Sequence, residues 1–306
     1  MASKRVEFKT VDGVTLRGDL TLASPQPNGT PIVIMTQGLT LLKEHYISNW
    51  GKRFVKAGFS TLLYDHRGWG SSEGTPRNVV NPMQQAEDYH DAVLFARSLP
   101  EIDGSRIAIW GIGHSAGAST IAAGDDPYIK AVILVMPFFS GAFDATNWPA
   151  GLLQRAYAER EQLVRAPAAE MQYIQVWNNS DAEAAGERGD ILLHGKVPWE
   201  FSRDARQLSD QAGTPWENWL ALQSLYHISK VEPQDHIHKI APRPMLYLAA
   251  TVDQISGPLE LMRAAFENAK EPKLFEQLQS DHLSNYKADA FEANVKLQIE
   301  FLQKNL

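Results

Sequence analysis

The sequence predicts an α/β fold with a mostly parallel central sheet flanked by helices. Short runs rich in β-branched residues alternate with longer stretches of helical periodicity, which is typical of a sheet that is covered on both faces. The chain has 306 residues, of which 44% are hydrophobic, and this is enough to bury one large core. We therefore expect one elaborated domain instead of two equal halves.

The predicted strands and helices follow one another in a regular order. Two runs, at 6–9 and 14–20, flank a turn at Asp12-Gly13 and predict an antiparallel hairpin. Parallel strands are then predicted at 32–35, 61–64, 107–110, 131–135, 245–248 and 274–278. Helices are predicted near 48–57, 83–99, 116–123, 258–269 and 288–304.

The chain between the strands at 131–135 and 245–248 is too long to be a structureless loop of a compact domain. We predict a helical cap at 141–234, inserted into a core made of 1–140 and 235–306. Five tryptophans lie inside this cap: Trp148, Trp177, Trp199, Trp216 and Trp219. These rings can form a small core of the cap, line a lid over an apolar substrate, or do both.

Charge and composition exclude several classes of function. The net charge is −7, and the basic residues are scattered and outnumbered, so we expect neither nucleic acid nor an anionic membrane as a partner. The chain has no cysteine, which excludes disulfides, thiolate metal sites and a cysteine nucleophile. The first residues lack the apolar core of a signal peptide, and no apolar run is long enough to span a bilayer. We expect a cytoplasmic protein.

The segment Gly113-His114-Ser115-Ala116-Gly117 fits the pattern G-x-S-x-G, directly after a predicted strand and before a helix of small residues. In that context the serine sits on a tight turn, and the helix N-terminus points its N–H groups at the reacting atoms. We therefore predict that Ser115 is a nucleophile and not part of a simple glycine-rich turn. His114 is expected to pack beside this turn, away from the reacting atom.

A serine nucleophile needs a base, and in this kind of site the chain order is serine, acid, histidine. His282 follows the last predicted strand and is the only histidine after His238, so we predict that His282 is the base. His236 and His238 form an H-x-H pair that can bind a metal, but no third ligand is apparent nearby. We expect exposed loop histidines there, with no metal and no cofactor.

The acid that orients the base is expected in the loop after the strand at 245–248, where Asp253 lies. Asp235 precedes that strand and would enter from the wrong end, and Glu260 is expected to begin a solvated helix. Asp281 is next to the predicted base in the sequence, but neighbouring side chains in a turn rarely align for such a hydrogen bond. We predict Asp253 as the acid.

Acyl transfer also needs N–H donors for the oxyanion that develops on the carbonyl oxygen. One predicted donor is the backbone N–H of Ala116, directly after the predicted nucleophile. The second is expected in the loop after the strand at 32–35, where Gly38 lets the chain turn closely toward Ser115. We predict Leu39 N–H as that donor.

These motifs resemble the α/β-hydrolase superfamily over nearly the whole chain. The shared stretches, in the usual order, are MTQGLT, GFSTLLYDHRGWGSSEG, DGSRIAIWGIGHSAG and SDHL. Within the superfamily, AEDYHDAVLFARSLPEIDG and SRIAIWG are similar to fungal hydrolases associated with polyketide synthases, which are called thiohydrolases or polyketide transferases. The resemblance implies an α/β-hydrolase fold, with Arg67 bracing loops near the active site.

Two positions depart from the pattern of these relatives. Many relatives have histidine-glycine where this chain has Gln37-Gly38, but the donor expected there is a backbone group and survives the change. Relatives often have two glycines where this chain has Ala116-Gly117, and the extra methyl is expected to narrow the floor of the pocket.

The resemblance and the residues above predict a serine-dependent acyl transfer through an acyl-Ser115 intermediate. Transesterification, lactonisation or hydrolysis would release an apolar, polyketide-type chain from a thioester on the acyl-carrier domain of a polyketide synthase. Two alternatives stay open. One is a stand-alone carboxylesterase that acts on small lipophilic esters, and the other is a non-catalytic, ligand-binding member of the same fold.

Overall fold

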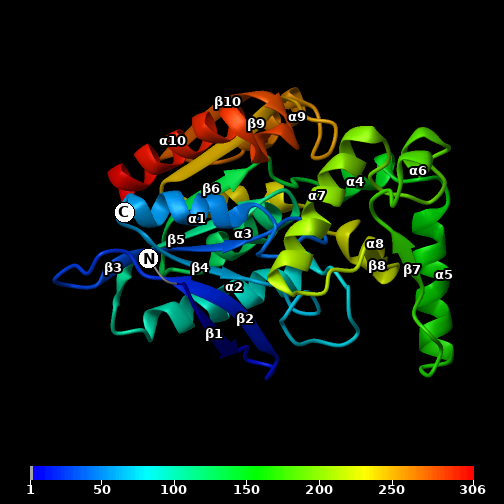
Figure 1. Cartoon of the computed structure of the whole chain (residues 1–306), viewed down its shortest axis with the longest axis horizontal. Helices are drawn as coiled ribbons and strands as arrows, with labels where there is room; N and C mark the ends of the chain where they lie inside the picture. The colour runs from blue at the N-terminus through cyan, green and yellow to red at the C-terminus, as the bar shows by residue number, and fades with distance from the viewer. Residues whose placement is uncertain (1–2) are drawn as a thin grey trace.

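Eight strands form one sheet in the order β1-β2-β4-β3-β5-β6-β9-β10 in the computed structural model, which describes residues 3–306 (Figure 1). The strands are β1 Ser3–Lys9, β2 Thr15–Thr21, β3 Thr30–Thr36, β4 Ser60–Tyr64, β5 Ile102–Ile112, β6 Ile129–Val135, β9 Met245–Val252 and β10 Lys273–Asp281. The β1–β2 and β2–β4 pairs are antiparallel, and every other neighbouring pair in this sheet is parallel.

The central strands are buried because helices cover both faces of the sheet. Every residue of β3 and β4 is buried, and the residues at 32–35 and 62–64 form apolar runs without alternation, as expected for strands covered on both faces. Helices α1 and α10 pack together on one face, and α2 and α3 pack together on the other. The helices of the core are α1 Ile47–Lys56, α2 Pro82–Arg97, α3 His114–Asp125, α9 Leu259–Glu267 and α10 Ala288–Asn305.

The cap segment between β6 and β9 lies at one end of the sheet, on the right in Figure 1 in green and yellow. Its elements are α4 Gly141–Asn147, α5 Leu152–Arg165, β7 Tyr173–Gln175, α6 Asp181–Ala185, α7 Lys196–Ala212, β8 Trp219–Ala221 and α8 Gln223–Ile228. Strands β7 and β8 form a small antiparallel sheet that the sequence did not predict, because three residues are too few to show a period.

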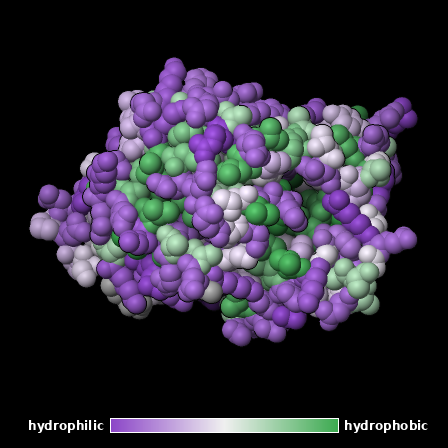
Figure 2. Space-filling model, turned by 90° about the horizontal axis from the view of Figure 1, so that it is seen from above, coloured by the Kyte–Doolittle hydropathy of each residue, from purple (hydrophilic) through white to green (hydrophobic). Residues whose placement is uncertain are grey.

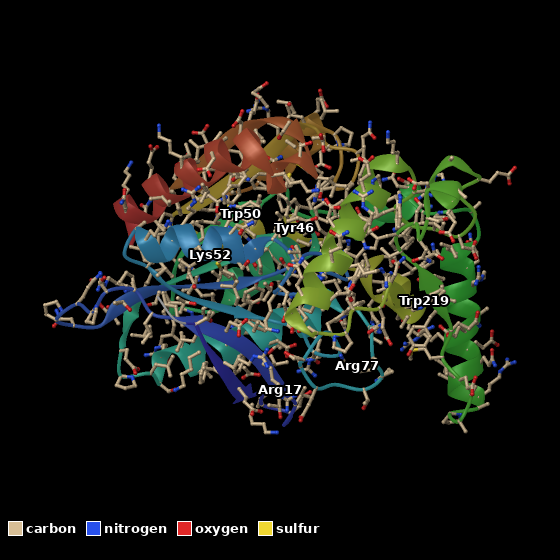
Figure 3. All side chains as sticks on the ribbon, in the orientation of Figure 1. Arg17, Tyr46, Trp50, Lys52, Arg77 and Trp219 are labelled. Carbon is tan, nitrogen blue, oxygen red and sulfur yellow. The ribbon has the colours of Figure 1, made fainter. Side chains whose placement is uncertain are left out.

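Aromatic side chains join the cap segment to the core. Tyr46, which is labelled near the start of α1 in Figure 3, stacks on Phe201 of α7 with ring centroids 4.7 Å apart. Trp177 Nε1 donates to Thr40 Oγ1 at 3.0 Å, and Trp216 Nε1 donates to the Thr40 carbonyl oxygen at 2.7 Å. Two cap tryptophans therefore hold the loop that follows β3.

The predicted fold class is confirmed, but two element boundaries next to the predicted nucleophile differ. Strand β5 continues two residues past the predicted end at Trp110, and α3 begins two residues before the predicted start at Ala116. The turn between them is the single residue Gly113. Over residues 3–306, no helix is both long and apolar enough to cross a membrane.

Candidate active site

The sharp turn from strand to helix occurs at Gly113. Its φ of 57° and ψ of −123° are allowed for glycine and strained for other residues. The chain can turn so closely because Gly111 precedes it: a Cβ at Gly111 would lie 2.5 Å from Ser119 Oγ and 2.6 Å from the Ala116 backbone. A Cβ at Gly113 would instead lie 3.8 Å from both Cε1 and Nε2 of His282, which is ordinary contact distance.

Asp253 and His282 lie side by side because they follow β9 and β10, which are neighbouring parallel strands. The His282 Nδ1 atom is 2.9 Å from Asp253 Oδ2, and both residues are buried. The other carboxylate oxygen of Asp253 accepts from the N–H groups of Ile255 and Ser256, each at 2.8 Å. A carboxylate at Nδ1 places the ring proton there, so Nε2 on the Gly113 side is free to accept a proton.

Asp281, the rival acid beside His282 in the sequence, has a different role. One oxygen of its carboxylate accepts from the N–H groups of Leu283 and Ser284, at 2.9 and 3.0 Å. These bonds shape the loop that follows β10, and they direct the carboxylate to the backbone instead of to the imidazole.

The geometry contradicts the prediction that Ser115 is the nucleophile. The side chain is buried, and its Oγ accepts from the Ile112 N–H at 2.9 Å and lies 3.0 Å from the Thr36 carbonyl oxygen. Within the described chain, Ser115 forms no hydrogen bond with His282, and it does not line the pocket that His282 faces. Ser115 lies in the first turn of α3, two residues beyond the turn at Gly113, and its hydroxyl faces the sheet.

The N–H of Ala116 is not free to be the predicted oxyanion donor, because it donates to the Gly113 carbonyl oxygen at 3.1 Å. Ala116 is fully buried, and its methyl does not narrow the pocket floor as predicted.

The residue after the turn is His114, whose N–H begins α3 and has no partner in the described chain. Leu39 N–H is likewise unbonded among residues 3–306, and Gly38 lies close to His114. Leu39 and His114 are therefore the candidate oxyanion donors.

A pocket of about 580 Å³ opens in front of His282 and Gly113. The cap segment supplies one apolar wall, made of Trp148, Trp177, Leu192, Leu193, Val197 and Pro198, and core residues that include Leu39, Phe138 and Ile255 supply the rest. Trp177 is buried as well, so this tryptophan serves both the cap core and the pocket wall.

In the face shown in Figure 2, hydrophilic residues cover most of the surface and hydrophobic residues gather over the middle of the molecule. A larger surface groove beside α5 contains neither His282 nor Asp253.

His114 forms a second pair with a carboxylate at the same pocket. Its Nε2 lies 3.2 Å from Asp144 Oδ2, and its ring stacks on Phe138 with centroids 4.4 Å apart. Burial raises the pKa of the Asp144 carboxyl. Since Asp144 belongs to α4, this contact holds the cap segment against the strand-to-helix turn.

Two other sequence predictions concern residues outside the pocket. Arg67 binds Asp88 and Asp12, so it joins the loop after β4 to α2 and to the hairpin turn. His238 is exposed, as expected, but it lies in a short 3-10 helix, Ile237–Lys239, and His236 is half-buried instead of exposed. Among the described residues, no group of three or more metal-ligating side chains is assembled.

The side chain of Gln37 shapes the loop that carries Leu39. Gln37 Nε2 donates to the His45 carbonyl oxygen at 2.5 Å, and Gln37 Oε1 accepts from the Gly38 N–H at 2.9 Å. These two bonds therefore hold the close turn of the loop.

Comparison with known proteins places the chain in a family. A family model described as serine aminopeptidase, S33, matches residues 30–279. The chain belongs to this α/β-hydrolase family. Thiohydrolase apmlB of Arthrinium phaeospermum is 30% identical, with 99% of this chain and 97% of that protein aligned. Polyketide transferase grgF of Penicillium sp is 29% identical, with 98% and 96% aligned.

Solved structures of α/β hydrolases agree with the fold. The crystal structure of the α/β hydrolase GrgF from Penicillium sp. sh18 matches with a TM-score of 0.82 at 29% identity, covering 100% of this chain and 99% of that chain. The structure of DcsB in complex with its substrate analogue matches with a TM-score of 0.83 at 28% identity, covering 99% of each chain. The expected resemblance to thiohydrolases and polyketide transferases is thereby confirmed.

Proposed function

We propose that this chain is an acyl-transfer enzyme that uses His282 and Asp253 to move protons at a thioester or ester carbonyl. The observation that carries the proposal is the 2.9 Å contact between His282 Nδ1 and Asp253 Oδ2. This contact leaves Nε2 available to a substrate in the pocket. Relatives named thiohydrolases and polyketide transferases support a reaction at an acyl group.

The walls of the pocket favour a long apolar acyl chain. A volume of about 580 Å³ suits a drug-sized ligand, and the tryptophans and aliphatic side chains of the cap segment supply apolar contacts. A polyketide-type chain meets these requirements, and its donor would be a thioester presented by an acyl-carrier domain. The carbonyl would lie near His282, with its oxygen toward the N–H groups of Leu39 and His114.

One alternative is a protein that binds the same chain without catalysis. The observation that favours it is Gly113, because the strand-to-helix turn carries no side chain that can attack the substrate. The paired His282 and Asp253 favour the enzyme, since a binding pocket has no need of a buried imidazole held by a carboxylate. A stand-alone carboxylesterase is the other alternative, and it would prefer short esters.

Acyl thioesters of increasing length, tested with and without an added alcohol, distinguish these functions. We expect free acid, ester or lactone to form, with kcat/KM rising about fourfold per methylene, since a buried methylene contributes about 0.8 kcal/mol. A preference for short oxygen esters would support the carboxylesterase. Tight binding measured by calorimetry without any product would support the ligand-binding protein.

A further inference from the structure

Gly113 leaves open space beside the imidazole that a side chain would otherwise fill. The hypothetical Cβ of this residue lies 3.8 Å from His282 Nε2, so the space beyond it is within hydrogen-bond reach of that nitrogen. Gly113 and His282 both line the pocket, so a substrate can reach this space. The space is large enough for an oxygen atom that the protein itself does not supply.

Among the described residues that line the pocket, no side chain provides a nucleophile that His282 Nε2 could activate. The hydroxyl-bearing side chains among them are Ser256 and Tyr286. Ser256 Oγ donates to the Met136 carbonyl oxygen and lies 3.4 Å from Nδ1, on the other side of the imidazole. Burial raises the pKa of the Tyr286 hydroxyl far above its ordinary value, so this group does not ionise in the pocket.

The two carboxylates that line the pocket, Asp144 and Asp281, are engaged elsewhere. The Asp144 carboxylate contacts His114 Nε2 at 3.2 Å, and the Asp281 carboxylate accepts from backbone N–H groups. Ser115, behind the turn, has its Oγ bonded to the backbone at Ile112 and Thr36. An acyl-enzyme on any of these groups would require the local structure to rearrange.

Building on the proposed function, we infer that acyl transfer in this chain proceeds by direct attack of a substrate oxygen, without a covalent acyl-enzyme, and that Gly113 makes room for that oxygen. The attacking oxygen belongs to water, to an alcohol, or to a hydroxyl of the acyl chain itself. These three sources share one chemistry and yield a free acid, an ester or a lactone.

The proton balance of this reaction needs only the imidazole. As the new C–O bond forms, the O–H proton moves to His282 Nε2, and the carbonyl electron pair moves to an oxyanion that faces Leu39 and His114 N–H. The oxyanion then re-forms the carbonyl as the C–S bond breaks, and the leaving thiolate takes the proton back from the imidazolium. The carboxylate of Asp253 stabilises the charged ring between the two steps.

Labelling with a fluorophosphonate tests this inference directly. We expect no label on the wild type, a label on residue 113 of Gly113→Ser, and no label when His282→Ala is added to that variant. Gly113→Ala is the matched control, because it adds the same Cβ with the same backbone strain and no hydroxyl. Its thermal melt shows whether a side chain at this position is compatible with folding.

A second experiment uses only the wild type and does not depend on the folding of any variant. Thioesters of one acyl chain with different leaving groups are offered to the enzyme together with an alcohol. A shared acyl-enzyme gives the same ratio of ester to acid for every leaving group, whereas direct attack gives a ratio that changes with it. We expect the ratio to change.

The outcomes separate this inference from the proposed function. A label on wild-type Ser115 that is lost in Ser115→Ala, or a constant ester-to-acid ratio, overturns direct attack and leaves acyl transfer standing. Absence of product with every thioester and ester overturns the proposed function, and direct attack with it.

Discussion

The two halves of the pocket floor differ in the catalytic groups that they carry. The loops after β9 and β10 hold Asp253 and His282 in a buried, hydrogen-bonded pair. The turn between β5 and α3 carries Gly113, and the nearest serine in the sequence, Ser115, is bonded to the backbone beneath it. The loops after β9 and β10 supply a base for proton transfer. The turn between β5 and α3 supplies space for a substrate atom and backbone N–H groups.

This difference separates proton transfer from covalent catalysis, which usually occur together in serine enzymes. A base beside an empty turn can still activate an oxygen that the substrate brings. We therefore expect variants of Asp253 and His282 to affect turnover strongly, and a variant of Ser115 to affect mainly stability.

His282→Ala has the largest expected effect. Loss of the base removes proton transfer in both directions, so kcat/KM is expected to fall about a thousandfold, within the usual range for general acid–base catalysis. Steady-state kinetics with a long-chain thioester checks this. His238→Ala is the control, because His238 is an exposed histidine outside the pocket. If folded His282→Ala retained most of the activity, His282 would not be the base, and the two halves would not differ in catalytic role.

Asp253→Asn is expected to cost less, about a hundredfold in kcat/KM, because the amide keeps an oxygen for the Ile255 and Ser256 N–H groups but no longer stabilises the imidazolium. Asp281→Asn is the matched control, since its carboxylate bonds to backbone N–H groups and not to the imidazole. Equal losses in the two variants would show that the loops matter only for their shape.

His66 lies beside Ser115, and its buried imidazole makes the stability of the protein depend on pH. Both residues line the same small cavity, and burial lowers the pKa of His66 to about 4. The unfolded chain therefore binds more protons than the native state below pH 6.5, and stability falls as the pH drops from 6.5 toward 4. At pH 5 the loss is about 2 kcal/mol.

His66→Phe is expected to remove that loss and to leave stability at pH 7 unchanged or higher, because neither ring nitrogen has a hydrogen-bond partner in the described chain. Urea unfolding at pH 7 and pH 5 measures both effects. His238→Gln serves as the exposed control. An unchanged pH dependence in His66→Phe would mean that another group causes the loss.

Ser115→Ala has the smallest expected effect. Loss of the hydroxyl leaves the Ile112 N–H without its acceptor and lowers stability by about 1 kcal/mol, while turnover stays close to that of the wild type. Ser119→Ala is the matched control, since Ser119 is also buried in α3 and donates to a carbonyl of its own helix. A folded Ser115→Ala variant without turnover would restore Ser115 as the nucleophile.

Most of the parallel sheet could be predicted from the sequence, because strands buried on both faces consist of continuous apolar runs. The end of β5 could not, since Gly111 indicates a turn when only the sequence is considered. In the structure, Gly111 belongs to the strand, where it lets Ser119 and Ala116 of α3 pack against the backbone.

That boundary error moved the predicted nucleophile by two positions. The pattern G-x-S-x-G selected Ser115, although Gly113 stands two residues after Gly111 and fits the turn itself. The positions of Asp253 and His282 were easier to predict, because the chain order serine, acid, histidine requires each to follow one of the last two strands. This held although β9 and β10 run past their predicted ends at 248 and 278. Which N–H groups are free depends on the backbone, so His114 could not be recognised as a donor while the turn was misplaced.

The most direct test of the account is the intact mass of the wild-type protein during turnover of a long-chain acyl thioester, with the reaction quenched at short times. We predict that product accumulates while the protein keeps its unmodified mass, since His282 and Asp253 activate an oxygen of the substrate beside Gly113. An acyl adduct that forms and decays at the rate of turnover, mapped to Ser115 or any other residue, would contradict the account.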